Sequence, residues 1–94
     1  MPERTVTIGS RSGLHARPAA LFVKAASQQP VRVKIRVGDK PGVDARSMLS
    51  VLALGATCGT EVTLEADGDQ ADEALDALAA LLVQDLDAEE SSHG

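Results

Sequence analysis

Residues 32–37 alternate strictly between charged and apolar side chains, and this pattern limits the possible folds strongly. Arginine or lysine occupies positions 32, 34 and 36, whereas Val33, Ile35 and Val37 are apolar. Successive side chains of a β-strand point to opposite faces, so the pattern predicts a strand with one buried face and one face in water. A sheet built around such a strand is covered on one face only.

Two further segments, residues 4–8 and 61–66, alternate in a similar way. Their inward positions are Val6, Ile8, Val62, Leu64 and Ala66. The sequence GDKPG at residues 38–42 has the composition of a hairpin turn, and it returns the chain through a short segment around Val43. The sequence therefore predicts four strands.

Between these strands lie segments whose apolar residues recur at helical spacing. Between residues 16 and 28 the spaced apolar residues are Ala19, Phe22, Val23 and Ala26. Pro18 is tolerated only in a first turn, so this helix is expected to begin near His15. Ser47 can cap a short second helix that Gly55 ends.

The final helix has the clearest apolar pattern. Its predicted buried stripe consists of Ala71, Ala74, Leu75, Leu78, Leu81 and Leu82, and Asp69 is the expected N-cap. The element order is then β-α-β-β-α-β-α, which predicts an α+β fold with a four-stranded sheet covered on one face by three helices. A chain of 94 residues suits one domain, predicted over residues 1–88, with residues 89–94 as a frayed acidic tail.

Charge is distributed unevenly along the chain. Residues 1–46 hold all nine lysines and arginines against three acids, a net charge of +6, whereas the remainder holds eleven acids and no lysine or arginine. The basic half suits an anionic ligand or an acidic partner. A solvated surface without a partner explains the same charges equally well.

Composition and hydropathy exclude several functions. Phe22 is the only aromatic residue, so nucleic-acid binding by base stacking is not expected. No apolar run approaches the ~18 residues of a membrane span, and no signal peptide is recognised. Cys58 is the only cysteine and excludes an internal disulfide. We expect a cytoplasmic protein that acts away from membranes.

The sequence GLHARP at residues 13–18 joins a loop to a helix start. His15 is thereby expected among backbone amides that lack helical partners, with Arg17 two residues later. This positive environment favours a bound anion and lowers the expected pKa of His15, which leaves a neutral imidazole able to attack phosphorus. A lone histidine elsewhere is more often a surface or capping residue.

Several motifs resemble the HPr family, the histidine-containing phosphocarriers of the bacterial phosphoenolpyruvate-dependent sugar phosphotransferase system. They are GLHARPAA at 13–20, GDK at 38–40, VDARSML at 43–49 and LGA at 54–56. The resemblance extends from residue 4 to about residue 86. It implies an open-faced β-sandwich of four antiparallel strands and three helices.

The resemblance also implies a function for named residues. His15 would accept a phosphoryl group on Nδ1 from enzyme I and pass it to sugar-specific enzyme IIA proteins, and Arg17 would interact with that group. The protein would be a transfer intermediate rather than an enzyme, and we expect a monomer without a cofactor. A carrier in a nitrogen-regulatory branch would use the same chemistry, and a regulatory HPr-like partner protein is a further alternative.

Ser47 corresponds to a serine that HPr kinase/phosphorylase modifies in many family members. Its sequence position is equally suited to a plain N-cap. Phosphorylation would add ~1.5 to 2 negative charges to the expected partner face and oppose the docking of an acidic enzyme I.

The short second helix has too many apolar residues to bury all of them. We expect Val51 and Leu54 to face the core. The others, together with one face of the first helix, form an expected partner patch, whose residues are Ala16, Ala20, Lys24, Ser27, Met48, Leu49 and Leu52.

Cys58 suggests two further kinds of site. With His15 and His93 as the only other soft ligands, it does not complete the four ligands of a zinc site, so no metal is expected. A nucleophilic pair of Cys58 and His15 would indicate a hydrolase or redox enzyme, although neither residue has an evident third partner.

Overall fold

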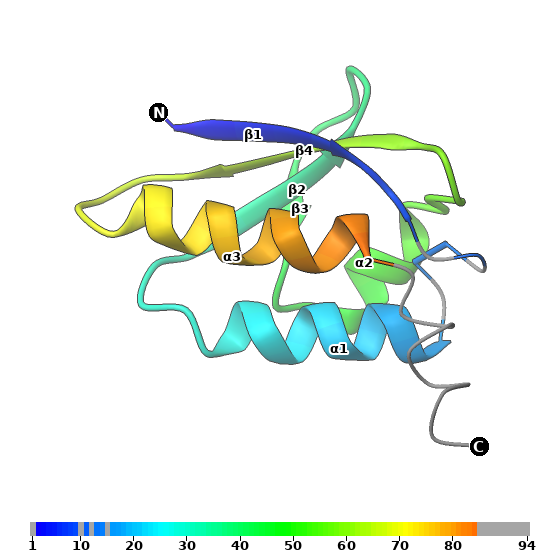
Figure 1. Cartoon of the computed structure of the whole chain (residues 1–94), viewed down its shortest axis with the longest axis horizontal. Helices are drawn as coiled ribbons and strands as arrows, with labels where there is room; N and C mark the ends of the chain where they lie inside the picture. Colours follow the sequence, from blue (N-terminus) through cyan, green and yellow to red (C-terminus); the bar gives the residue numbers. More distant parts are fainter. Residues whose placement is uncertain (1, 10, 12, 15, 85–94) are drawn as a thin grey trace.

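The computed structural model describes residues 2–9, 11, 13, 14 and 16–84. Within them, strands and helices follow the predicted order (Figure 1). The strands are β1 (Glu3–Thr7), β2 (Val33–Val37), β3 (Val43–Asp44) and β4 (Glu61–Ala66), and the helices are α1 (Ala16–Ser27), α2 (Met48–Ala53) and α3 (Ala71–Val83). The predicted tail at residues 89–94 lies outside the described part of the chain.

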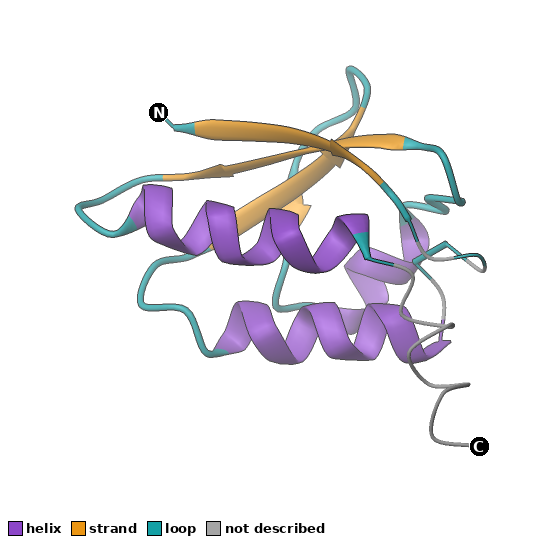
Figure 2. Ribbon diagram, in the orientation of Figure 1, coloured by secondary structure: helices purple, strands orange, loops and turns teal. Residues whose placement is uncertain are grey.

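The four strands form one antiparallel sheet in the order β1-β4-β2-β3. In β2 and β4 the inward residues pair directly, with Ile35 opposite Leu64. All three helices lie on the same side of the sheet (Figure 2). Helix α3 packs on β1 and β4, whereas α1 packs against α2 and α3. The fold is thus the predicted open-faced sandwich.

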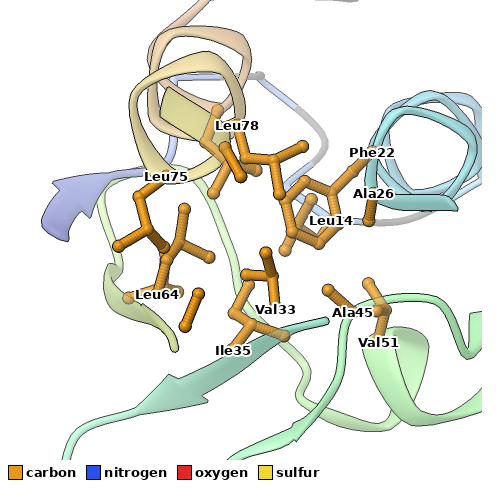
Figure 3. Close-up of a cluster of buried hydrophobic side chains, with 14 of the residues drawn as sticks. Leu14, Phe22, Ala26, Val33, Ile35, Ala45, Val51, Leu64, Leu75 and Leu78 are labelled. Carbon is orange, nitrogen blue, oxygen red and sulfur yellow. The ribbon is translucent and has the colours of Figure 1, made fainter. Parts of the chain in front are cut away.

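The core fills the space between the sheet and the helices. Phe22 of α1 is fully buried, and it points with Leu14 toward the strand residues Val33 and Ile35 (Figure 3). Leu75 and Leu78 enter the same core from α3. Burying one large apolar side chain contributes about 1.5–3 kcal/mol, so this shared core fixes how α1 and α3 lie on the sheet.

The outer face of the sheet is polar. The hydroxyl groups of Thr5 and Thr63 are 3.1 Å apart across paired strands. Arg36 lies between two carboxylates, at 3.1 Å from Glu65 and 3.7 Å from Glu3. These contacts explain why the charged positions of the alternating pattern remain on the uncovered face.

Two details of α3 differ from the prediction. Its N-cap is Gln70 rather than Asp69, and it makes no side-chain capping hydrogen bond. Gly68 has φ +110°, and its carbonyl accepts a hydrogen bond from the amide of Ala71, so Asp69 falls within a turn and the helix begins later. Leu81, predicted in the buried stripe, is only half-buried.

Candidate functional site

The chain that leads to residue 15 is fixed against the segment after α2. The amide of Leu14 donates a 2.8 Å hydrogen bond to the carbonyl oxygen of Ala56, and the Leu14 side chain is buried. Gly13 has φ +71°, and a Cβ placed on it would lie 2.4 Å from the same carbonyl oxygen. Glycine is therefore required by both backbone conformation and space.

The beginning of this loop is held by the end of α3. Gly9 donates a 2.9 Å hydrogen bond from its amide to the carbonyl of Leu82. A Cβ on Gly9 would lie 2.1 Å from the carbonyl oxygen of Val83, so the backbones are in direct contact. Tertiary backbone contacts of this kind leave no local mark in a sequence.

Helix α1 begins directly after residue 15, as predicted. His15 itself lies outside the described residues, as does the side chain of Ala16. Pro18 is buried in the first turn, where its missing amide hydrogen costs no helical hydrogen bond. The first turn carries no acidic residue, so no side-chain carboxylate of that turn opposes the partial positive charge of the helix N-terminus.

The outer face of α1 carries the described residues of the predicted partner patch. Arg17 is exposed in the first turn. Ala20, Lys24 and Ser27 are also exposed, whereas Ala19 and Phe22 face the core. Because the face of α1 that carries Ala19 and Phe22 is buried, the face that carries Arg17 and Lys24 lies in solvent.

Helix α2 supplies one strongly exposed apolar side chain to the patch. Leu49 is 81% exposed, whereas Met48 and Leu52 are half-buried against the core. Val51 is fully buried as predicted. Leu54 was expected in the core, but it is only half-buried, because it caps the helix after its last turn.

The two helices that carry the patch are neighbours. Helix α2 packs against α1, and it lies beside the end of α1 at which the chain enters the helix (Figure 1). The patch residues, far apart in sequence, therefore belong to adjoining elements.

Known proteins similar to this chain in sequence and fold include HPr and HPr-like proteins. A family model described as the phosphotransferase-system HPr component phosphorylation site matches residues 2–84. The chain belongs to the HPr family. The phosphocarrier protein HPr of Streptomyces coelicolor is 47% identical over 87 residues, which cover 93% of this chain and 94% of that protein. The predicted membership is confirmed.

Other relatives include two HPr structures and an HPr-like protein. The crystal structure of HPr from Thermoanaerobacter tengcongensis has a TM-score of 0.80 and 41% identity, with 87% of this chain and 91% of that chain covered. A structure described as an HPr dimer from the same organism has a TM-score of 0.62 and 39% identity, with coverage of 100% and 99%. The HPr-like protein Crh of Bacillus subtilis is 38% identical over 86 residues, covering 92% of this chain and all of Crh.

Ser47 is the N-cap of α2, as predicted. Its side-chain oxygen accepts a 3.3 Å hydrogen bond from the amide of Ser50, and its backbone is extended. The preceding residue, Arg46, is exposed, and its amide donates to the carboxylate of Asp44 at 2.9 Å. The capping role is thereby confirmed, whereas phosphorylation of Ser47 stays a prediction.

Cys58 is exposed in the turn between α2 and β4. The turn is fixed by the amide of Gly59, which donates to the carbonyl of Ile8, and by a hydrogen bond from the Thr57 amide to the Thr60 hydroxyl. Among the described residues, no group of three or more histidine, cysteine or acidic side chains could hold a metal ion. No described helix is long and apolar enough to cross a membrane.

Proposed function

We propose that this protein carries a phosphoryl group on His15 between enzyme I and sugar-specific enzyme IIA proteins of the phosphotransferase system, in the cytoplasm. The observation that carries the proposal is the junction around residue 15. Leu14 is fixed by its hydrogen bond to Ala56 on one side, and α1 begins at Ala16 on the other. This support leaves little freedom for the backbone on either side of the proposed phosphoryl acceptor.

The proposed chemistry is a displacement at phosphorus. The neutral Nδ1 atom of His15 attacks, a nitrogen–phosphorus bond forms, and the bond between phosphorus and the enzyme I donor breaks. The N-terminus of α1 and the guanidinium of Arg17 stabilise the negative charge of the bound group. In the second transfer a nucleophile of enzyme IIA attacks the phosphorus and the nitrogen–phosphorus bond breaks, which regenerates neutral His15, so the protein is a carrier and not an enzyme.

The partner patch is the proposed docking surface for both proteins. Within the patch, Lys24 provides positive charge on α1 and Leu49 provides an apolar contact on α2, and Arg17, outside the patch, adds a second exposed cation to α1. An exposed large apolar side chain beside cations suits an acidic partner with a hydrophobic pocket, because charge steers the encounter and apolar burial holds the complex.

Intact-mass spectrometry tests the carrier proposal. The full chain is mixed with phosphoenolpyruvate, magnesium and a matching enzyme I, beside the His15→Ala variant. We expect one acid-labile phosphoryl group on the wild-type protein and none on the variant. Absence of the group from folded wild-type protein, while a control HPr is labelled, would overturn the proposal.

A regulatory role through Ser47 is the second candidate. It is favoured by the 38% sequence identity with Crh, which is described as the catabolite repression HPr of Bacillus subtilis. Incubation with HPr kinase/phosphorylase and ATP is expected to place phosphate on Ser47. Unmodified Ser47 after that incubation would exclude regulation by that kinase. If His15 accepts no phosphoryl group but Ser47 does, the regulatory role replaces the carrier role.

Two further properties belong to the same proposal. Comparison of enzyme IIA proteins as acceptors distinguishes sugar uptake from a nitrogen-regulatory branch.

We propose a monomer as the working form. Because a similar HPr structure is described as a dimer, the oligomeric state is tested by sedimentation across a concentration series. A concentration-independent dimer would contradict the proposal.

A further inference from the structure

A pocket opens on α2 beside the hairpin between β2 and β3. Its volume is about 350 Å³, and its lining residues are Lys40, Pro41, Val43, Ser50, Ala53 and Leu54. These residues come from the hairpin, from β3, and from α2 with its C-terminal cap. Neither α1 nor Leu49, both assigned to the docking surface, contributes to the described lining.

The walls of the pocket are apolar, with two polar groups. Pro41, Val43, Ala53 and Leu54 provide the apolar surface, and the Ser50 hydroxyl is the neutral polar group. Lys40 is the only charged lining residue, and it forms no ion pair with any other described residue. A small apolar pocket with one cation selects for a matching anion.

Acidic side chains near the pocket do not neutralise Lys40. Asp44 pairs with Lys34 in the strand register, one position away from the inward Ile35–Val43 pair, so its side chain is on the outer face of the sheet. The Asp44 carboxylate also accepts the Arg46 amide hydrogen bond. Asp39 precedes Lys40 in the exposed turn but does not line the pocket.

We propose that this pocket binds a small organic anion, namely a carboxylate with a short apolar body. The volume falls at the lower end of the ~300–1,000 Å³ of small-molecule sites. The apolar body packs between Val43 and Leu54, and the anionic group reaches the Lys40 ammonium at the rim. The proposal is independent of phosphoryl transfer, because its residues differ from those assigned to the carrier function.

Amide NMR spectra of the isotopically labelled full chain provide the test. The probes are hexanoate, hexanol, which has the same chain without charge, and acetate, which has the charge without the chain. Hexanoate is expected to cause saturable shifts centred on Val43, Ser50, Ala53 and Leu54. Hexanol is expected to bind about three- to five-fold more weakly, since an exposed ionic contact adds modest affinity, and acetate to cause no saturable shift there.

Two variants with matched controls separate the pocket from general surface binding. Ala53→Leu fills the pocket from an exposed helix position and is expected to abolish saturation, whereas Ala77→Leu on the exposed face of α3 leaves it unchanged. Lys40→Gln is expected to reduce hexanoate affinity to that of hexanol, and Lys34→Gln on the outer sheet face to leave it intact. A spectrum of each variant confirms the fold.

Four results would overturn the proposal. The first three are shifts centred on Leu49 and α1, equal affinity for hexanoate and hexanol, and no saturable shift through the millimolar range. The fourth is hexanoate binding that survives both Lys40→Gln and Ala53→Leu, which would place the binding site on another surface.

Discussion

The backbone amide of Leu14 donates to the carbonyl oxygen of Ala56 at 2.8 Å, and this bond joins the loop before α1 to the segment after α2. The two residues are far apart in the sequence, yet their contact sets the backbone entry to the proposed phosphoryl acceptor. Gly13 permits the contact, because any side chain there would meet the same carbonyl.

Gly13→Ala is expected to lower the free energy of unfolding by about 2–4 kcal/mol, since positive φ and the contact with Ala56 both oppose a Cβ. It should also slow phosphorylation by enzyme I. Urea unfolding and the rate of phosphoryl uptake measure the two effects. The control is Gly38→Ala, which has φ +56° but open space around its Cβ, and whose expected loss is about 1 kcal/mol. Equal losses for both variants would contradict the role of the Ala56 contact.

Leu49→Asp is expected to weaken enzyme I binding at least about ten-fold, as loss of a central apolar contact does at an interface. Because Leu49 is 81% exposed, stability should change by less than about 0.5 kcal/mol. Calorimetric titration and thermal unfolding check the two expectations. Ala77→Asp adds the same charge to an exposed position on α3 and should leave binding unchanged. Unaltered affinity of Leu49→Asp would remove Leu49 from the docking surface.

Ser47→Ala is expected to cost about 1 kcal/mol of stability, because the amide of Ser50 loses its capping acceptor. Ser47→Asn keeps a capping oxygen and should retain most of that stability while it removes the hydroxyl that a kinase would modify. Chemical unfolding of the two variants gives the comparison. If Ser47→Asn and Ser47→Ala destabilise the protein equally, the Ser47 cap contributes little to the free energy of unfolding.

Arg4 connects β1 to α3 through Asp76 at 2.9 Å and Asp72 at 3.2 Å. The hydrogen bonds that the Arg4 guanidinium donates to Asp76 and, with a smaller effect, to Asp72 raise the pKa of Arg4 above its ordinary value. Because folding raises this pKa, the stability that the Arg4 contacts contribute is fully present below the pKa of Arg4 in the unfolded chain. It is lost only as pH rises through the pKa of Arg4 in the folded protein. Deprotonation of Arg4 therefore does not weaken these contacts near neutral pH.

A double-mutant cycle with Arg4→Gln and Asp76→Asn is therefore expected to give a favourable coupling that falls as salt is added. The coupling should stay constant from pH 7 to pH 9, roughly, since the Arg4 charge persists there. Urea unfolding at several salt concentrations measures it. A coupling that grows with salt would show that the contact is not electrostatic.

Local patterns were sufficient to predict the elements of this protein. Alternation at residues 32–37 predicted β2, and helical spacing around Phe22 predicted α1, because each element has one buried face and its period repeats in the sequence. The motif around His15, together with the motifs at 38–40, 43–49 and 54–56, was sufficient to recognise the family.

Tertiary packing decided what local patterns do not contain. The strand order β1-β4-β2-β3, the contact of Gly13 with Ala56 and the pocket beside Lys40 join segments distant in the sequence. The N-cap of α3 shifted from Asp69 to Gln70 because the turn at Gly68 delays the first helical hydrogen bond. Leu54 is half-buried because it follows the last turn of α2 as its C-cap, whereas Val51 within the helix is fully buried. Periodicity determines which face of an element is apolar, whereas the packing of all elements together determines how much of that face is covered.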